Sequence, residues 1–366
     1  MRYVALLALA AVDAAGYSVI APVVPAIGAE TSAGPGTLGV LVAVFGLGQL
    51  VAFPLAGRAL HARPARTVLL VSLVLVTLGD LGFVLLDGLA AWFPARFVQG
   101  VGAGGLWMGV TFAVLERWPG EEYRRLSGAL AAYSVGGVGG YALGAVEGVR
   151  GPFVLHLVLA GAGVAAAFAL GAVRSRPAFG SDVGAVRSRR FALASAGILL
   201  VAIGYGVLDG PLPLHFAEQL TQREIATLLV GASLLLGAAA VVAGRISPRA
   251  ALWAGTVAVP LGLGAAGAAD AVGVWIVAVG VAAIGFGLGE AGALGVLLDG
   301  VGPERIVLAM VLWSQVWGVG YLAGPAVAGA VAATVGYGAL VLVPLVASAL
   351  VVACFAAARP APAPAR

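Results

Sequence analysis

Twelve long apolar stretches, separated by short breaks of charge, proline or glycine, constrain the fold of this chain more than any other feature of its sequence. Each stretch has about the 20 residues that a helix needs to cross the hydrocarbon core of a bilayer. With 61% hydrophobic and 10% charged residues, the chain has too few polar side chains to cover a soluble globule of 366 residues. The stretches lie at residues 3–25, 36–56, 67–86, 90–115, 126–146, 152–173, 191–212, 225–244, 250–268, 272–298, 306–330 and 334–357.

The predicted class is therefore an all-α membrane protein with twelve transmembrane helices. The stretches are rich in glycine and alanine, which favours helices packed closely through small residues. No ten-residue segments alternate with period two, so a β-barrel is not expected. The first stretch begins like a signal peptide, but it continues to Pro25 and takes part in the repeat described below, so we expect a membrane helix there.

Arginine supplies all 20 basic residues, and their positions indicate how the chain lies in the membrane. If the N-terminus is cytoplasmic, Arg150 and Arg223 fall on the outer side and Arg96 falls inside a helix. Cytoplasmic loops of membrane proteins carry an excess of basic residues, so both termini are predicted to be cytoplasmic. The arginines on the cytoplasmic side are Arg2, Arg58, Arg63, Arg66, Arg117, Arg124, Arg125, Arg174, Arg176, Arg187, Arg189, Arg190, Arg245, Arg249, Arg305, Arg359 and Arg366.

Composition also bears on cofactors and on the host cell. The single cysteine, Cys354, excludes an intrachain disulfide and a cysteine metal cluster. Because the three histidines are scattered along the chain, we expect neither a metal nor a cofactor. Arginine without lysine, together with heavy use of alanine, glycine and valine, is typical of a GC-rich bacterial genome and predicts a bacterial inner-membrane protein.

The longest stretch without apolar character lies near the middle of the chain. Residues 174–190 carry five arginines against one aspartate, and we interpret them as a basic cytoplasmic linker. It would join an N-terminal six-helix bundle at 1–173 to a C-terminal six-helix bundle at 191–358. The tail at 359–366 is rich in proline and is expected to be disordered.

The two halves repeat each other at an offset of about 184 residues. Gly16-Tyr17-x-Val19 recurs as Gly204-Tyr205-x-Val207, and two prolines follow each copy. A two-fold repeat of six helices is typical of transporters in which two half-bundles rock about a central substrate site. Further matches pair Ala56-Gly57-Arg58 with Ala243-Gly244-Arg245, Trp92 with Trp275, Gly102 with Gly285, Gly104 with Gly287, Gly136 with Gly320 and Gly140 with Gly324.

The sequence RFVQGVGAGG, residues 96–105, puts a permanent positive charge inside the fourth apolar stretch. It resembles the fourth-helix motif of the major facilitator superfamily, Arg-x-x-Gln-Gly-x-Gly, and the match is complete at Arg96, Gln99, Gly100 and Gly102. The resemblance extends over the whole chain. It implies twelve helices in two pseudo-symmetric six-helix bundles and a central cavity lined by helices 1, 4, 7 and 10.

A second motif lies in the fifth stretch. The sequence GGVGGYALG, residues 136–144, resembles the family's antiporter motif Gly-x-x-x-Gly-Pro-x-x-Gly, which is associated with exporters. Tyr141 stands where that motif has proline, and the proline reappears in the repeat at Pro325. We expect small residues and proline in these motifs to let helices pack closely, at Gly100, Gly102, Gly136, Gly140, Gly144, Gly324 and Pro325.

A third motif lies between the second and third stretches, in GRALHARPAR at 57–66. Gly57 and Arg66 fit the family pattern Gly-x-Leu-x-Asp-Arg-x-Gly-Arg-Arg/Lys, whereas His61 replaces its aspartate and Pro64 its second glycine. The resemblance implies a conformational-switch loop that latches the two halves, here built differently. His61 could make the latch depend on pH, or it could be a solvated loop histidine.

Charged residues inside the membrane are the candidates for proton coupling, because each costs about 2.5–3.5 kcal/mol to insert and normally faces a cavity or a partner. Asp13 is the first choice for the proton site, since it lies near the middle of its helix. Arg96 is expected to pair with a carboxylate such as Asp80; a fixed ion pair that only holds helices together is the alternative. The full set is Asp13, Asp80, Arg96, Asp209 and Glu290.

Aromatic and amide side chains on the same helices are candidates for cargo contact. Asp13 and Tyr17 are four residues apart, so they share a helix face. Arg96 and Trp107 share a face too, since eleven residues return a helix to within about 20°. Carboxylates beside aromatic rings favour cationic cargo. The candidates are Tyr17, Gln99, Trp107, Tyr133, Tyr205, Trp313 and Trp317, of which Trp313 and Trp317 could equally serve packing.

The leading hypothesis is proton-coupled efflux of small amphipathic or cationic molecules by a secondary transporter. The alternatives are a facilitator or symporter that imports a metabolite, and a membrane sensor that does not transport. No nucleophile with a base, no paired metal ligands and no phosphate loop occur, so an enzyme is not expected. The expected partners are a small-molecule substrate, protons and the lipid bilayer, without nucleic acid, and the expected state is a monomer.

Overall fold

The computed structural model describes residues 2–170, 188–301 and 305–357, and within them every long element is a helix. The linker expected at 174–190 lies outside the described residues up to 187, and so does the whole tail at 359–366. In chain order the segments are α1 (Arg2–Ser18) with α2 (Ile20–Thr31), α3 (Pro35–Ala62), α4 (Ala65–Leu85), α5 (Leu89–Arg117), α6 (Glu122–Leu143), α7 (Arg150–Ala169), α8 (Arg189–Asp209) with α9 (Leu212–Phe216), α10 (Gln222–Ala243), α11 (Pro248–Ala268), α12 (Val272–Leu298), α13 (Ile306–Thr334), η3 (Tyr337–Val341) and α14 (Leu342–Ala357).

Eleven of these segments are long and apolar enough to cross a membrane, when α1 and α2, α8 and α9, and η3 and α14 are each taken as one segment. The twelfth is α6, a helix of 22 residues whose first turns carry Arg124 and Arg125. The predicted all-α class with twelve membrane helices is confirmed. The chain is an integral membrane protein.

The first helix of each half breaks at the same place, and proline explains the break. Pro22 has no N–H to donate to the carbonyl of Ser18, and α1 ends at Ser18. Pro213 stands in the same relation to Asp209, the last residue of α8. The single helix expected at 3–25 is therefore two helices, because an intrahelical hydrogen bond is missing there.

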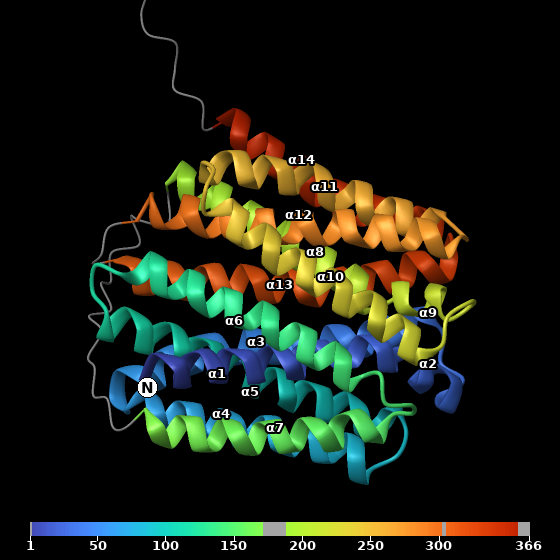
Figure 1. Cartoon of the computed structure of the whole chain (residues 1–366), viewed down its shortest axis with the longest axis horizontal. Coiled ribbons are helices and arrows are strands. Elements are labelled where there is room, and N and C mark those ends of the chain that lie inside the picture. The colour runs from blue at the N-terminus through green and yellow to red at the C-terminus, as the bar shows by residue number, and fades with distance from the viewer. Residues whose placement is uncertain (1, 171–187, 302–304, 358–366) are drawn as a thin grey trace, which may run out of the picture.

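The helices lie nearly parallel in two groups (Figure 1). The segments α1 to α7 form the first half, in the lower part of the view, and α8 to α14 form the second half above it. The halves meet where α3 packs on α13 and α6 packs on α10. This arrangement is the predicted pair of six-helix bundles.

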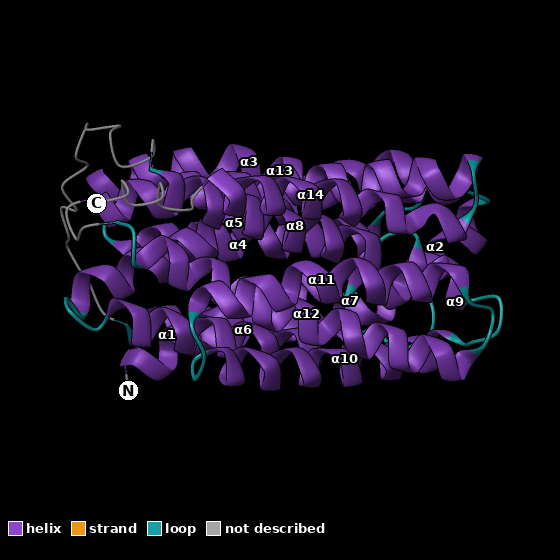
Figure 2. Cartoon of the chain, turned by 90° about the horizontal axis from the view of Figure 1, so that it is seen from above, coloured by secondary structure: helices purple, strands orange, loops and turns teal. Residues whose placement is uncertain are grey.

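The two ends of the bundle differ in charge. We call the end at which α1 begins the arginine-rich end; α2 and α9 lie at the opposite end, as Figures 1 and 2 both show. Arg150 and Arg223 begin or closely follow the start of helices at the opposite end. The described arginines of the arginine-rich end are Arg2, Arg58, Arg63, Arg66, Arg117, Arg124, Arg125, Arg189, Arg190, Arg245, Arg249 and Arg305.

Two buried tryptophans show how closely the halves repeat each other. The indole Nε1 of Trp92 donates to the carbonyl of Leu86 at 3.0 Å, and that of Trp275 donates to the carbonyl of Ala269 at 2.6 Å. Each bond reaches back six residues to the turn before the helix. Both rings are fully buried. The repeat of the sequence is thus a repeat of hydrogen bonds as well.

Helices cross at glycines where no side chain would fit. A Cβ atom on Gly100 of α5 would lie 2.9 Å from the Cα of Phe45 in α3, and one on Gly48 would lie 2.7 Å from the backbone nitrogen of Val101. The backbones of α3 and α5 therefore touch, as in other membrane bundles built on small residues. Added Cβ atoms would also collide with neighbouring helices at Gly102, Gly136, Gly140, Gly144 and Gly324.

Candidate functional site

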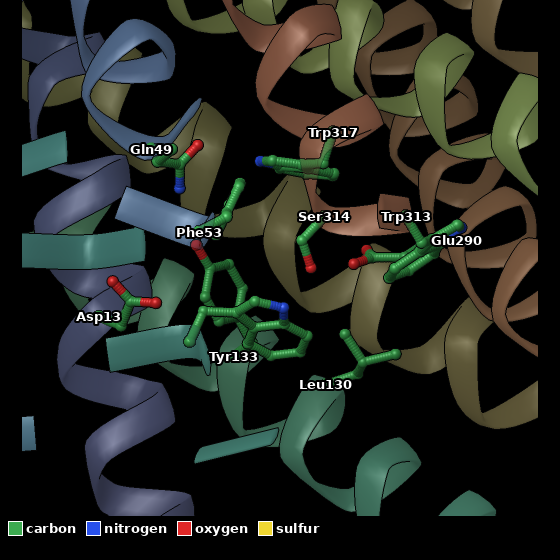
Figure 3. A pocket seen from close by; sticks show the side chains of 10 residues that line it. Asp13, Gln49, Phe53, Leu130, Tyr133, Glu290, Trp313, Ser314 and Trp317 are labelled. Atoms are coloured by element: carbon green, nitrogen blue, oxygen red, sulfur yellow. The ribbon is translucent and has the colours of Figure 1, made fainter. Parts of the chain in front are cut away.

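A cavity lies between the two halves, and we call it the central cavity (Figure 3). Helices α1, α3, α5 and α6 of the first half and α12 and α13 of the second contribute its walls. The lining residues are Asp13, Gln49, Phe53, Trp107, Leu130, Tyr133, Glu290, Trp313, Ser314 and Trp317.

Two carboxylates reach the central cavity, one from each half. Asp13 of α1 and Glu290 of α12 lie on opposite sides of it in Figure 3. Asp13 is 3% exposed, and neither of its oxygens has a hydrogen-bond partner within the described chain. Gln49 Oε1 and Ser314 Oγ also lack a partner there. An ionised carboxylate in such a place is costly unless a cation or a proton neutralises it.

Aromatic rings supply most of the remaining wall. Trp107 and Tyr133 meet edge to face with their centroids 5.9 Å apart. Trp313 is fixed by a hydrogen bond from its Nε1 to the carbonyl of Ala194 at 3.3 Å. Rings beside carboxylates attract cations through their quadrupoles as well as through charge.

Glu290 stands where the central cavity meets two neighbouring hollows. One of them runs between α6, α10 and α12 and extends from Glu290 to Arg124 at the arginine-rich end. Toward the opposite end the space is filled by a buried aromatic cluster, in which Tyr17 and Tyr321 have ring centroids 4.6 Å apart and Phe45 packs on both. The hollow between α6, α10 and α12 thus leads toward the arginine-rich end, whereas the other hollow, lined by Ser18, Tyr141 and Leu208, lies toward the opposite end.

The structure separates the predicted site residues into three groups. Asp13, Glu290, Trp107, Tyr133, Trp313 and Trp317 line the central cavity. Tyr17 and Tyr205 line the adjacent hollow, together with Tyr133 and Glu290. Asp80, Arg96, Gln99 and Asp209 are buried but line none of these spaces.

The expected direct pair between Arg96 and Asp80 is wrong, because Gln99 lies between them. Arg96 Nη1 donates to Gln99 Oε1 at 3.0 Å, and Gln99 Nε2 donates to Asp80 Oδ1 at 2.6 Å. The other oxygen of Asp80 lies 2.7 Å from Nδ1 of His156 in α7. The carboxylate of Asp80 is therefore fully engaged by an amide and an imidazole.

Arg96 has a different task at the end of α1. Its guanidinium donates to the carbonyls of Gly16 and Tyr17, both at 3.3 Å, and lies 4.2 Å from the centroid of the Phe45 ring. The last carbonyls of a helix lack intrahelical partners, and the helix dipole favours a cation there. Because α1 ends at Ser18, four residues before Pro22, Arg96 is placed to cap the end of this helix. Trp107 of the same helix lines the central cavity, whereas Arg96, eleven residues earlier, lies outside it.

Asp209 is likewise held outside the central cavity. Its Oδ1 accepts a hydrogen bond from the hydroxyl of Tyr141 at 2.9 Å, and its Oδ2 accepts one from Tyr321 at 3.3 Å. Of the candidate carboxylates, Asp13 and Glu290 line the central cavity, and Asp80 and Asp209 do not.

The residues of the expected conformational-switch loop lie mainly in helices. Gly57 and His61 belong to α3, and Arg66 lies in the first turn of α4. The guanidinium of Arg66 lies 5.7 Å from the ring centroid of Phe168 in α7, a contact inside the first half. A latch between the halves at this loop stays a prediction.

Several residues of the site escaped the sequence reasoning. Gln49 was the most visible signal, since it is an uncharged polar side chain within an apolar stretch. Phe53, Leu130 and Ser314 are ordinary helix residues, and only the packing of α3, α6 and α13 brings them to the central cavity.

Comparison with known proteins identifies the family. The Major Facilitator Superfamily matches residues 6–194 of the chain. Multidrug resistance protein 2 of Bacillus subtilis (strain 168) is 29% identical over 151 residues, which cover 40% of this chain and 37% of the relative, so the chain matches little more than a third of that protein's length. The crystal structure of the human organic anion transporter MFSD10 (TETRAN) superposes with a TM-score of 0.72 at 16% identity, covering 96% of this chain and 97% of the other, a likeness of fold alone. The chain belongs to the major facilitator superfamily, a family of membrane transporters.

Proposed function

We propose that the protein is a secondary transporter that expels amphipathic cations from a bacterial cell in exchange for protons, by alternating access across the inner membrane. Family membership supports transport, and the name of the Bacillus subtilis relative agrees with efflux. The observation that carries the proposal is the unpartnered carboxylate of Asp13, buried in the wall of an aromatic cavity.

The exchange follows from the chemistry of that carboxylate. A buried carboxylate tolerates neutralisation by a proton or by a cationic cargo, and it gains little from both together. Cargo that enters therefore favours loss of the proton, and a proton that enters favours loss of the cargo. If the two events occur on opposite sides of the membrane, proton entry drives cargo out.

The excess of arginine fixes the proposed orientation. Basic loops face the cytoplasm, so the arginine-rich end is the cytoplasmic one. The hollow from Arg124 to Glu290 then gives cargo a route from the cytoplasmic side to the central cavity. No cofactor takes part, and one chain contains both halves of the site.

The proposal is tested in inside-out vesicles that hold a proton gradient. Lipophilic cations should dissipate the gradient in a manner that depends on the protein, whereas sugars should not. Dissipation by sugars or other metabolites in the opposite coupling direction would support an importer instead. No response to any compound in the panel would contradict proton-coupled transport altogether.

Replacing Glu290 by glutamine tests the second carboxylate. Loss of its charge should raise the concentration of a lipophilic cation needed for half-maximal transport about tenfold, which corresponds to about 1.4 kcal/mol of lost attraction. A neutral amphipathic cargo should be unaffected. Initial rates across a concentration series, in vesicles with equal amounts of protein, measure the effect.

The matched control is Glu147→Gln, which removes a carboxylate from an exposed loop at the opposite end. It should leave both cargo classes unchanged. An equal loss for cationic and neutral cargo in Glu290→Gln would show that Glu290 acts through the shape of the cavity and not through its charge.

A further inference from the structure

A buried hydrogen bond joins the two halves at the residue where this chain departs from the antiporter motif. Tyr141, in the place of the motif's proline, donates its hydroxyl to Asp209 across 2.9 Å. Tyr141 lies near the end of α6 in the first half, and Asp209 is the last residue of α8 in the second. The two residues are 3% and 0% exposed. The substitution replaces a residue without a donor by one that reaches across the interface.

Asp209 is fixed by its own half as well. Tyr321 of α13 donates to its second oxygen, and Pro325 of α13 packs on Gly210, just beyond the end of α8. Pro325 is the repeat partner of Tyr141. The same position of the repeat therefore reaches the end of α8 from both halves, in one by packing and in the other by a hydrogen bond.

The groups around Asp209 determine how strong its bond with Tyr141 is. Asp209 ends a helix, where the helix dipole disfavours negative charge, so the carboxylate depends on its donors. Besides Tyr141 and Tyr321, the groups that face it are Tyr17 of α1 and the guanidinium of Arg96 in α5. A hydrogen bond to an ionised acceptor is about twice as strong as one between neutral groups. Loss of the Tyr141 hydroxyl therefore removes a buried hydrogen bond between the halves, which is charge-assisted whenever Asp209 is ionised.

A second set of hydrogen bonds joins the halves nearer the surface of the opposite end. Nε2 of Gln222, the first residue of α10, donates to the carbonyls of Gly144 and Val146, each at 2.9 Å, and its Oε1 accepts from the backbone nitrogen of Gly148 at 3.0 Å. Most of these bonds are exposed, so water can replace them when the halves part. The Tyr141–Asp209 bond, by contrast, is buried.

We propose that the Tyr141–Asp209 hydrogen bond holds the opposite end closed and must break each time that end opens. Tyr141 is then a positioning residue that sets the balance between the two access states. The inference rests on alternating access in the proposed function, although it requires neither a particular cargo nor protons. It assigns a role to the tyrosine that distinguishes this chain from the motif.

The test measures access at the opposite end directly. In a Cys354→Ala background, Ser18→Cys places one thiol beside Tyr17 and Tyr141 in the hollow next to the central cavity, where Ser18 is 3% exposed. Its labelling by a membrane-impermeant maleimide, added from the outer side, reports how often that end opens. Tyr141→Phe should raise the labelling rate about tenfold or more, the factor expected for one buried hydrogen bond to a charged group.

Tyr321→Phe is the matched control, because it removes from the same carboxylate a hydroxyl of the second half, while its ring and the Tyr141–Asp209 bond between the halves stay in place. It should change the rate less than about twofold. Asp209→Asn keeps an acceptor oxygen in a weaker, neutral bond and should give an intermediate rate. A second reporter, Ser72→Cys, is buried within the first half and should stay unreactive unless the variant unfolds.

Equal labelling of Ser18→Cys with and without Tyr141→Phe would overturn the inference, and so would an equal increase in Tyr321→Phe. The assay involves no cargo and no proton gradient. A protein that fails every transport test can therefore still confirm the role of Tyr141, and failure here leaves proton exchange at Asp13 untouched.

Discussion

Asp13→Asn should reduce cargo-dependent proton release in inside-out vesicles to the level of vesicles without the protein. Asparagine has nearly the size of aspartate but neither binds nor releases a proton near neutral pH. It therefore mimics the protonated carboxyl permanently. Downhill movement of a neutral amphipathic cargo should continue, so the variant separates proton exchange from passage of cargo. Fluorescence of a pH-sensitive dye and uptake of a labelled cargo measure the two processes in the same vesicles.

The stability of the variant distinguishes a proton site from a structural charge. Because neither oxygen of Asp13 has a partner in the described chain, asparagine should not lower the melting temperature. Asp270→Asn, in an exposed loop, is the control and should change neither proton release nor melting. Unchanged proton release in Asp13→Asn, or a marked drop in its melting temperature, would contradict the assignment.

Gly100→Val should prevent the first half from folding correctly. The added Cβ would meet the backbone of Phe45, which cannot move aside as a flexible side chain could. Overpacking of this kind costs about 3 kcal/mol or more when the backbones of two helices must separate, a large share of the stability of a domain. The yield of monodisperse protein in detergent and its thermal melting measure the loss.

Gly161→Val provides the matched control, since an added Cβ there would meet no atom within 4 Å. It makes the same change in the helix α7 and should leave yield and melting within the spread of the parent. If Gly100→Val expressed and melted like Gly161→Val, the close approach of α3 and α5 at Phe45 would be refuted.

The overall architecture could be predicted from the sequence because it follows from local rules. The length of the apolar stretches predicts membrane helices. The hydrogen bonds that Trp92 and Trp275 share follow from a repeat visible in the sequence itself. The breaks after Ser18 and Asp209 also obey a local rule, since each lies four residues before a proline. An unbroken helix over 3–25 conflicts with this rule at Pro22.

The site could be predicted in part from the sequence, and the predictions that failed share one cause. Helical periodicity gives the direction of a side chain around its own helix, but it does not give the depth of the neighbouring helices or their partners. Trp107 and Arg96 share a direction, yet one reaches the central cavity and the other caps α1. The hydroxyl that donates to Asp209 belongs to Tyr141, which is 68 residues away in the sequence. Only the packed halves bring such groups together.

The lining of the central cavity gives the protein a built-in optical probe. Three of its seven tryptophans, Trp107, Trp313 and Trp317, stand at the cavity wall, and two of them come from the second half. Indole emission depends on the polarity and the charges around the ring, so an aromatic cation that stacks there should change both intensity and colour. Binding can therefore be followed by the intrinsic fluorescence of the unlabelled protein, before any cargo has been identified by transport.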